Sequence, residues 1–155
     1  MAEEIGELLR SRNESLSVAE SCTGGKVGDM ITDVPGSSDY FLGGVISYSN
    51  EAKIELLGVI RETLRSKGAV SEDVAIQMAR GVRERMGATY GIGITGIAGP
   101  SGGSKTKPVG LVHIAIASSE GHVSEWRVFK GSRTDIKIAA AELSLEMLLK
   151  FVKER

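Results

Sequence analysis

The sequence predicts an α/β domain whose sheet is mostly parallel, contains one antiparallel strand, and is covered by helices on both faces. Two features of the order of elements carry this prediction. Helix-like segments separate the first three strand-like segments, as in parallel strands joined by crossovers. A tight turn at residues 119–121 joins the last two strands, as in an antiparallel hairpin. The 155 residues, 41% hydrophobic and 25% charged, suffice for a single domain over residues 1–155.

The first half of the chain alternates between helical and extended patterns. Apolar residues at helical spacing predict a helix over 3–10, and alternation predicts a strand over 15–19. A second helix-like segment covers 26–31 and is stopped by a proline and glycine pair. A strand loosened by glycine follows over 40–48, before a short helix over 50–57.

The second half begins with the clearest helix, over 72–86. Ser71 is a suitable N-cap, the first turn is acidic as the helix dipole favours, and four apolar side chains form a stripe along one side. The remaining predicted elements are strands over 90–95, 109–117 and 123–129 and a last helix over 132–153.

Composition argues against several classes of partner. The 19 Lys and Arg residues balance 20 Asp and Glu residues without a long run of one sign. We therefore expect a small-molecule partner, and neither nucleic acid nor an anionic membrane surface. No apolar stretch approaches the roughly 20 residues that cross a bilayer. The acidic start of the chain is unlike a signal peptide, so we expect the cytoplasm.

Cysteine and histidine are too few to suggest a disulfide or a metal site. Cys22 is the only cysteine, which excludes an intrachain disulfide. The two histidines occur without HExxH or CxxC spacing, so we expect no metal and no cofactor. His113 lies in an apolar run and His122 near a turn, which favours packing or surface roles over a role as general base.

The segment Glu20–Gly25 is the first candidate for chemistry, because it places Ser21 between a strand and a helix. At such a junction the first backbone N–H groups of the helix have no intrahelical partner. Gly24 and Gly25 let a ligand approach these groups, so an anion or an oxyanion would be stabilised there. Ser21 is then a candidate nucleophile. The alternative is an ordinary N-cap, a common role for serine before a helix.

A dinucleotide-binding pattern, GxGxxG, occurs over residues 91–96 in the wrong context. The glycines of that motif follow a strand and open a helix, whereas here they alternate with isoleucine inside a strand. We interpret residues 95–107 instead as a glycine-rich loop at the carboxyl edge of a strand. Open α/β sheets bind ligands at that edge, and Thr95 would lie at the mouth of the loop.

Tyr48 and Lys53 supply the second chemical element. Ser49 or Asn50 can cap the helix that follows. Tyr48 then lies at the exit of the strand and Lys53 one turn inside the helix, so both can point to one cleft. A serine hydroxyl needs a base, and the candidates are a desolvated lysine or a tyrosinate held by that lysine. The alternative is an ordinary strand tyrosine and a solvated lysine.

Arg133 is a candidate for binding an anionic group. It would lie in the first turn of the last helix, where a cation is unfavourable to the helix dipole unless it is paired. Its partner can be an anionic group of a ligand or, equally, a carboxylate of the protein in a structural ion pair.

Seven ordered blocks of the sequence together resemble the CinA C-terminal domain family, the nicotinamide-nucleotide amidases. Two of these blocks, Ala19–Gly25 and Tyr48–Lys53, contain the candidates described above. The other blocks are Thr32–Ser38, Gly43–Val45, Gly68–Glu72, Thr95–Pro100 and Lys107–Gly110. Seven blocks in order at family-like spacing are far more specific than any one of them, and they extend over nearly the whole chain.

The resemblance implies a three-layer α/β/α domain that hydrolyses nicotinamide mononucleotide to nicotinic acid mononucleotide and ammonia, a reaction of NAD salvage in the pyridine nucleotide cycle. Carried over to this sequence, Ser21 is the nucleophile, and Tyr48 with Lys53 forms the base system. The substrate-binding residues that it implies are Glu20, Thr23, Gly24, Gly25, Thr95, Gly99, Gly102 and Arg133.

Two segments depart from the family pattern. The family often has Gly or Asp in place of Ser101. It also commonly has Gly-Asp-Arg with a second Arg where this chain has Gly131-Ser132-Arg133 and Lys137, so the contacts to a phosphate group are not assigned. Many members also carry an N-terminal domain linked to ADP-ribose hydrolysis, an activity that we do not expect of these residues. Two other functions remain open, a non-catalytic nucleotide-binding module and a serine amidase for another small amide. We expect a homo-oligomer.

Overall fold

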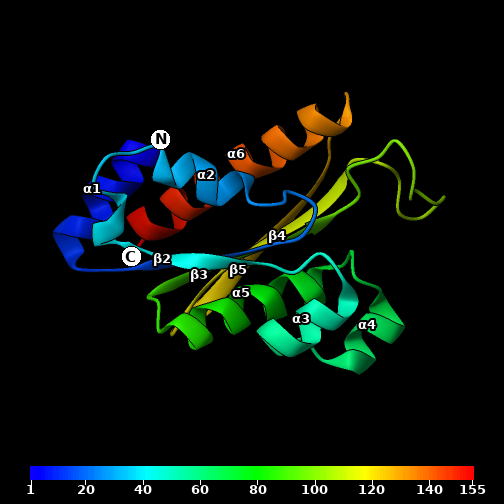
Figure 1. The fold of residues 1–155 in the computed structure, drawn as a ribbon, viewed down its shortest axis with the longest axis horizontal. Coiled ribbons are helices and arrows are strands. Elements are labelled where there is room, and N and C mark those ends of the chain that lie inside the picture. The colour runs from blue at the N-terminus through cyan, green and yellow to red at the C-terminus, as the bar shows by residue number, and fades with distance from the viewer.

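The computed structural model describes all residues from 1 to 155 and consists of three layers, a five-stranded sheet between two groups of helices (Figure 1). The strands are arranged in the order β2-β1-β3-β4-β5 across the sheet. They are β1 (Leu16–Glu20), β2 (Phe41–Ile46), β3 (Tyr90–Gly96), β4 (Leu111–Ser118) and β5 (Gly121–Val128).

The strand directions confirm the predicted fold class. β1 lies between β2 and β3 and is parallel to both, whereas β4 is antiparallel to β3 and β5 is antiparallel to β4. β4 is therefore the one strand that runs against the other four. The sheet is mixed and mostly parallel, with helices on both faces (Figure 1).

The helices divide between the two faces of the sheet. One face is covered by α1 (Ala2–Arg12), α2 (Lys26–Thr32) and α6 (Arg133–Lys153), and the other by α3 (Asn50–Leu57), α4 (Arg61–Lys67) and α5 (Glu72–Met86) (Figure 1). A single 3₁₀ turn, η1 (Ser37–Asp39), precedes β2. The helix α4 has no counterpart in the sequence prediction. It has only seven residues, no side-chain cap, and one buried side chain, Leu64, so it lacks the apolar periodicity that predicted the other helices.

Side-chain caps explain why α3 and α5 begin where the sequence predicts. The Ser49 hydroxyl accepts the N–H of Ala52 at 3.0 Å, and the Ser71 hydroxyl accepts the N–H of Val74 at 3.3 Å. Each bond satisfies one of the backbone donors that a helix leaves free at its start. The cap of α3 fixes the first turn of that helix at the end of the connection from β2, and this turn carries Lys53.

The two faces of the sheet are packed differently. A core of 23 buried residues lies between the sheet and α1, α2 and α6. On the other face, α5 approaches the sheet closely because β3 contains Gly91 and Gly93. A Cβ on Gly91 would lie 2.1 Å from the carbonyl oxygen of Ala79, and one on Gly93 would lie 2.2 Å from that of Ala75. These glycines of the GxGxxG pattern therefore serve helix packing.

The parallel arrangement brings several functional segments to one end of the molecule. Both termini lie at the opposite end, near α1, and the connection over 97–110 between β3 and β4 projects beyond the sheet (Figure 1). The carboxyl ends of β1, β2 and β3 point toward this projecting loop. Residues that follow these strands therefore meet at that edge of the sheet. No helix is both long enough and apolar enough to span a membrane.

Candidate active site

Ser21 is the first residue after β1, in the turn that leads to α2. Its backbone N–H donates to the carbonyl of Ile94 at 3.0 Å, which extends the pairing of β1 with β3 by one residue and fixes the turn. The serine is buried, with 7% of its surface exposed. The N-cap of α2 is Gly25, which has no side chain to cap with. The alternative interpretation of Ser21 as an N-cap is therefore wrong.

Glu20 occupies the helix N-terminus that was expected to be open to a ligand. Its buried carboxylate accepts the N–H groups of Gly25 at 3.0 Å, Val27 at 3.2 Å and Gly28 at 2.9 Å. A negative charge of the protein therefore already satisfies the first amides of α2. These three amides are therefore not free to hold an oxyanion, and the role of Glu20 in substrate binding stays a prediction. The Glu20 carboxylate lies on the face of the sheet that α2 covers, and its three hydrogen bonds fix the turn between β1 and α2.

Lys53 is the side chain in direct contact with Ser21. It lies in the first turn of α3 and is 1% exposed. Its Nζ lies 3.0 Å from the Oγ of Ser21. It also lies 2.7 Å from the carbonyl oxygen of Ser47 and 3.4 Å from that of Tyr48. Burial lowers the pKa of Lys53 below its ordinary value, and none of the ion pairs of the protein involves this lysine.

The three contacts of Lys53 suit a neutral amine. A neutral Nζ has two N–H donors and one lone pair, whereas an ammonium has three donors and no acceptor. The two carbonyl oxygens can only accept, so they can take the two N–H groups. The Ser21 hydroxyl is then the one neighbour that can donate to the lone pair. This geometry suits transfer of a proton from Ser21 to Lys53.

The neighbouring thiol does not compete with the serine. Burial raises the pKa of Cys22 to about 12, so the thiol stays protonated near neutral pH. The thiolate is the nucleophilic form of cysteine, and this environment disfavours it. Ser21 is therefore the better nucleophile candidate of the two.

Tyr48 lies at the rim of the site. Its side chain is 61% exposed, and its hydroxyl accepts a hydrogen bond from the Nη2 of Arg133 at 2.8 Å. Only its backbone carbonyl reaches Lys53. The structure therefore joins Lys53, and not the hydroxyl of Tyr48, to the serine.

Arg133 connects three segments around the site. Besides the bond to Tyr48, its Nη1 donates to the carbonyl of Gly99 at 2.7 Å. It lies in the first turn of α6, where Ser132 and Asp135 form a capping box that satisfies the helix start. Neither partner of Arg133 is a carboxylate, so the structural ion pair that was one alternative for this residue is not formed.

The serine and lysine open into a pocket of about 180 Å³. Its walls are formed by Ser21, Cys22, Tyr48, Asn50, Lys53, Ala69, Val70, Thr95, Gly96, Ala98 and Arg133. The structure thus brings together five residues that the sequence placed in the site, Ser21, Tyr48, Lys53, Thr95 and Arg133. They come from the segments after β1 and β2, from α3, from the end of β3 and from the start of α6.

Ala69 and Val70 form a wall of the pocket that residue chemistry alone did not indicate. They precede α5, and Thr95 holds them in place, because its Oγ1 donates to the carbonyl of Ala69 at 2.8 Å. Small apolar residues before a helix carry no chemical signature. The block Gly68–Glu72 of the family resemblance was the one signal that pointed to this segment.

The other predicted substrate-binding residues do not line the pocket. Thr23 is 1% exposed, and its hydroxyl has no hydrogen-bond partner. Gly24 and Gly25 adopt φ values of +60° and +105°, so the turn itself requires glycine. Gly99 is buried and contributes its carbonyl to Arg133, and Gly102 is exposed in the connection between β3 and β4.

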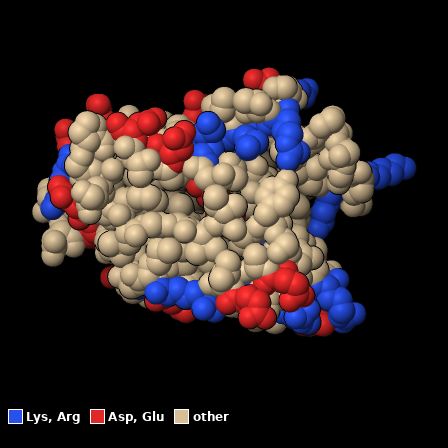
Figure 2. Space-filling view, viewed as in Figure 1, with Lys and Arg blue, Asp and Glu red and all other residues tan.

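Lys137 is a basic residue near the site, and the sequence left its contacts unassigned. Its Nζ lies 3.7 Å from the position that a Cβ would take on Gly24. It follows Arg133 by one turn of α6, so the two side chains share a helix face, and this spacing was the available signal. Figure 2 shows a group of Lys and Arg side chains on this side of the molecule, between α2 and the N-terminal half of α6.

Neither histidine belongs to the Ser21 pocket. The Nδ1 of His122 lies 2.9 Å from the Nη2 of Arg80 on the surface. His113 is half-buried in β4, and burial lowers its pKa. No group of three or more His, Cys, Asp or Glu side chains is placed to hold a metal ion.

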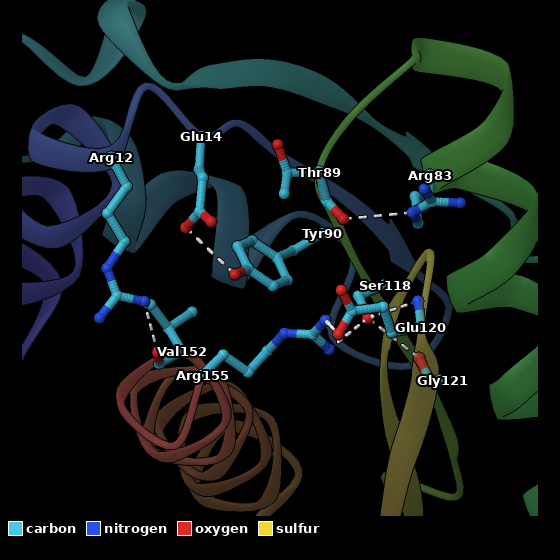
Figure 3. Close-up of polar contacts among 10 residues, drawn as sticks. All are labelled: Arg12, Glu14, Arg83, Thr89, Tyr90, Ser118, Glu120, Gly121, Val152 and Arg155. Atoms are coloured by element: carbon cyan, nitrogen blue, oxygen red, sulfur yellow. Dashed lines mark hydrogen bonds and ion pairs between the residues drawn. The ribbon is translucent and has the colours of Figure 1, made fainter.

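A larger cavity of about 840 Å³ lies at the other end of the sheet, between the end of α6 and the turn from β4 to β5 (Figure 3). Its polar groups bind one another. The Tyr90 hydroxyl donates to Glu14 at 3.1 Å, and the Nη1 of Arg12 donates to the carbonyl of Val152 at 2.7 Å. None of the residues predicted for the site lies in this cavity.

The fold and the site define a three-layer α/β/α domain with a buried serine and lysine pair at the turn from a strand to a helix. The family model of the CinA C-terminal domain matches residues 1–152. The chain therefore belongs to the CinA C-terminal domain family.

Curated relatives agree with this membership. The chain is 59% identical over 127 residues to a CinA-like protein of a Nostoc species, an alignment that covers 82% of this chain and 30% of the relative. It is 47% identical over 154 residues to a putative competence-damage inducible protein of Halothermothrix orenii, covering 99% of this chain and 37% of the relative. The chain thus spans about a third of the length of these relatives.

Solved structures show the same fold. The competence/damage inducible protein CihA of Agrobacterium tumefaciens is 41% identical and superimposes with a TM-score of 0.89, covering 95% of this chain and 94% of that one. A CinA superfamily protein of Klebsiella pneumoniae is 29% identical and superimposes with a TM-score of 0.95, covering 99% of this chain and 96% of that one.

Proposed function

We propose that the chain is a serine amidohydrolase that converts nicotinamide mononucleotide to nicotinic acid mononucleotide and ammonia. The observation that carries the proposal is the 3.0 Å contact between the Oγ of Ser21 and the buried Nζ of Lys53. A lysine that is desolvated and lacks a carboxylate partner is held toward its neutral form, which can accept a proton. Membership of the CinA family and the seven sequence blocks support the choice of substrate.

In the acylation step, Lys53 accepts the hydroxyl proton while the Oγ of Ser21 attacks the carboxamide carbon. The tetrahedral intermediate carries a negative charge on the former carbonyl oxygen. The N–H groups of Cys22 and Thr23 donate to no backbone carbonyl of the protein, so they are the candidates to stabilise this charge. When the carbon–nitrogen bond breaks, Lys53 returns its proton to the leaving nitrogen. Ammonia departs, and the serine remains esterified.

In the deacylation step, a water molecule takes the place of ammonia. Neutral Lys53 accepts a proton from the water as its oxygen attacks the ester carbon. The carbon–oxygen bond to Ser21 then breaks, and Lys53 gives the proton to the serine oxygen. The product leaves as a carboxylic acid that ionises at neutral pH. The same lysine therefore serves both steps, and each step returns it to its neutral form.

The small size of the pocket suggests that only one part of the substrate binds inside it and that the rest binds outside. Its volume of about 180 Å³ is below the range of about 300–1,000 Å³ that is typical for whole ligands. The pocket would therefore hold the carboxamide end, and the ribose phosphate would extend past the rim. Arg133 and Lys137 lie on that side and supply positive charge for the phosphate. In this arrangement Arg133 exchanges its bond to Tyr48 for one to a phosphate oxygen.

Incubation of the purified protein with nicotinamide mononucleotide tests the proposal. We expect ammonia and nicotinic acid mononucleotide to form in equal amounts, and we expect mass spectrometry to detect the acyl group on Ser21 after rapid acid quenching. Binding of the nucleotide without ammonia release by the wild-type protein would favour the non-catalytic module instead.

A panel of amides tests the choice of substrate separately from the mechanism. We expect nicotinamide mononucleotide to have a higher kcat/KM than nicotinamide or nicotinamide riboside, because only the nucleotide carries the phosphate that Arg133 and Lys137 would bind. Faster hydrolysis of an amide that lacks a phosphate would contradict the substrate assignment, while the serine amidase mechanism would stand.

A further inference from the structure

β5 is an edge strand with large exposed apolar side chains. It pairs with β4 along one side, and its other side is free. Trp126 is 62% exposed and Val128 is 44% exposed. An exposed edge of this kind is a template for pairing with another chain. The other edge strand, β2, carries no charged side chain that could select one register of pairing.

The hydrogen bonds to β4 determine which residues of β5 face the free edge. The N–H of Phe129, just past the end of β5, donates to the carbonyl of Gly110 at 2.9 Å, so this residue points its backbone groups toward β4. The register of the two strands is continuous. Because backbone groups alternate in direction along a strand, Ser124, Trp126 and Val128 present their N–H and C=O groups to the free edge. These groups are available for a further strand.

The charges of β5 favour one register for pairing with a second copy, because among axes at residues 124–128 it alone places opposite charges in facing positions. Two copies of β5 related by a two-fold axis pair in antiparallel fashion. An axis centred on Glu125 places Glu125 opposite the same glutamate of the partner, and an axis centred on Arg127 places two arginines opposite each other. An axis centred on Trp126 places Glu125 opposite the partner's Arg127, and does so twice. Opposite charges in directly facing positions stabilise strand pairing, and like charges destabilise it.

The register centred on Trp126 also satisfies the backbone. Trp126 faces the free edge, so it forms a hydrogen-bonded pair with its own copy, and Ser124 forms another with the partner's Val128. Glu125 and the partner's Arg127 then form non-hydrogen-bonded pairs, in which the side chains lie closer together. Within one chain, the Nε of Arg127 already lies 2.7 Å from the Oε1 of Glu125, so both side chains project on the same face of the sheet. Four charges would form one alternating cluster.

We propose that two copies of this chain associate through their β5 edges, with the two-fold axis at Trp126, to form one continuous ten-stranded sheet. The partner is identified by its complementary sequence of charges, which is that of β5 itself. The two Trp126 side chains lie on the same face at the axis and cover each other. This surface is separate from the Ser21 pocket, which lies beyond the carboxyl ends of β1, β2 and β3.

Charge reversal tests this interface. Light scattering after size exclusion should give the wild-type protein twice the chain mass of 16.4 kDa. Glu125→Arg and Arg127→Glu each place like charges opposite each other, so each variant alone should dissociate at least about tenfold more readily. An equimolar mixture of the two variants should restore the dimer, because each chain then faces opposite charges at both positions. Arg65→Glu, on the exposed surface of α4, is the control that should leave the dimer unchanged.

The single tryptophan provides an independent measurement. Trp126 is the only tryptophan of the chain, so its emission reports this surface alone. Its emission maximum should shift to shorter wavelength as the wild-type protein is concentrated, and it should not shift in either single variant. A wild-type protein that stays monomeric, or a dimer that neither single reversal weakens, would overturn the proposal. Circular dichroism of each variant establishes that the chain is folded in these comparisons.

Discussion

The two ends of β3 hold two cavities that differ in size and in how their polar groups are satisfied. Tyr90, at the start of the strand, borders the cavity of about 840 Å³, and Thr95 and Gly96, at its end, border the pocket of about 180 Å³. The strand rises roughly 3.3 Å per residue, so Tyr90 and Gly96 lie about 20 Å apart. In the larger cavity, Arg12, Glu14 and Arg155 all have hydrogen-bond partners within the protein.

Pairing explains this difference. At the start of β3, Glu14 accepts the Tyr90 hydroxyl and Arg155 donates to Ser118, so these groups have partners within the protein (Figure 3). At the end of β3, Lys53 is buried without a carboxylate and contacts a serine hydroxyl. A desolvated and unpaired amine is the group whose pKa departs from the ordinary value in the direction that catalysis requires. We therefore expect the chemistry at the smaller pocket, where the amine is desolvated, and not at the larger cavity.

The largest expected effect comes from the serine. Ser21→Ala should lower kcat by several powers of ten, because it removes the nucleophile from an intact pocket. Glu14→Gln, in the larger cavity, is the matched change at the other end of the strand and should leave kcat within about twofold. The assay is ammonia release, with nucleotide binding measured by calorimetry. Comparable losses in both variants would remove the distinction between the two cavities.

Replacement of the lysine should have the next largest effect. Lys53→Met keeps an unbranched side chain in the buried space and removes the amine, so kcat should fall about 10²–10⁴-fold, the usual contribution of a general base. Lys53→Arg keeps a positive charge that is effectively never a base and should be similarly impaired. Thermal melting checks that each variant is folded. Turnover by folded Lys53→Arg within a few-fold of wild type would exclude proton abstraction by this residue.

The carboxylate behind the turn should affect stability more than chemistry. Glu20→Gln retains the shape of the side chain but places an amide donor beside amides that need an acceptor, so we expect a loss of about 1–3 kcal/mol in the free energy of unfolding. Urea denaturation provides the measurement. An unchanged denaturation midpoint together with a loss of nucleotide binding would instead indicate that Glu20 contacts the substrate.

The smallest expected effect concerns the tyrosine. Tyr48→Phe removes a hydroxyl that contacts Arg133 and not Ser21, so kcat should stay within about tenfold of wild type while KM changes. Steady-state kinetics separates the two constants. A loss in kcat as large as that of Lys53→Met would mean that Tyr48 moves to the serine when substrate binds, and that the two residues act as one base system.

The sequence predicted the elements well where local chemistry determines them. The helices α3 and α5 have the predicted bounds because Ser49 and Ser71 cap them, and the turn at 119–121 correctly indicated the antiparallel strand. The helix α4 was missed because packing under α5, and not its own pattern, supports it. Local signals therefore predicted the fold class and the capped helices. Elements that depend on tertiary contacts, such as α4, were not predicted.

The candidate site was predictable in part. Tyr48 and Lys53 were expected in one cleft, because Lys53 lies one turn into the helix that follows Tyr48, and the family resemblance joined Ser21 to them. The hydrogen bonds from the α2 amides to the Glu20 carboxylate were not predictable from the segment Glu20–Gly25. They depend on which face of the sheet the Glu20 side chain lies on. The bond between Arg133 and Tyr48 joins residues 85 positions apart and leaves no mark in either local pattern.

The most direct test of the account is the pKa of Lys53. We expect NMR of the labelled side chain to give a pKa below the ordinary value of about 10.4, and we expect kcat/KM to rise with pH through the same value as the amine becomes neutral. Because the unfolded chain then binds more protons, stability should also rise with pH between the two values, and Lys53→Met should remove this slope. A lysine that titrates at its ordinary value, or turnover that falls as it deprotonates, would contradict the claim that Lys53 is the base for Ser21.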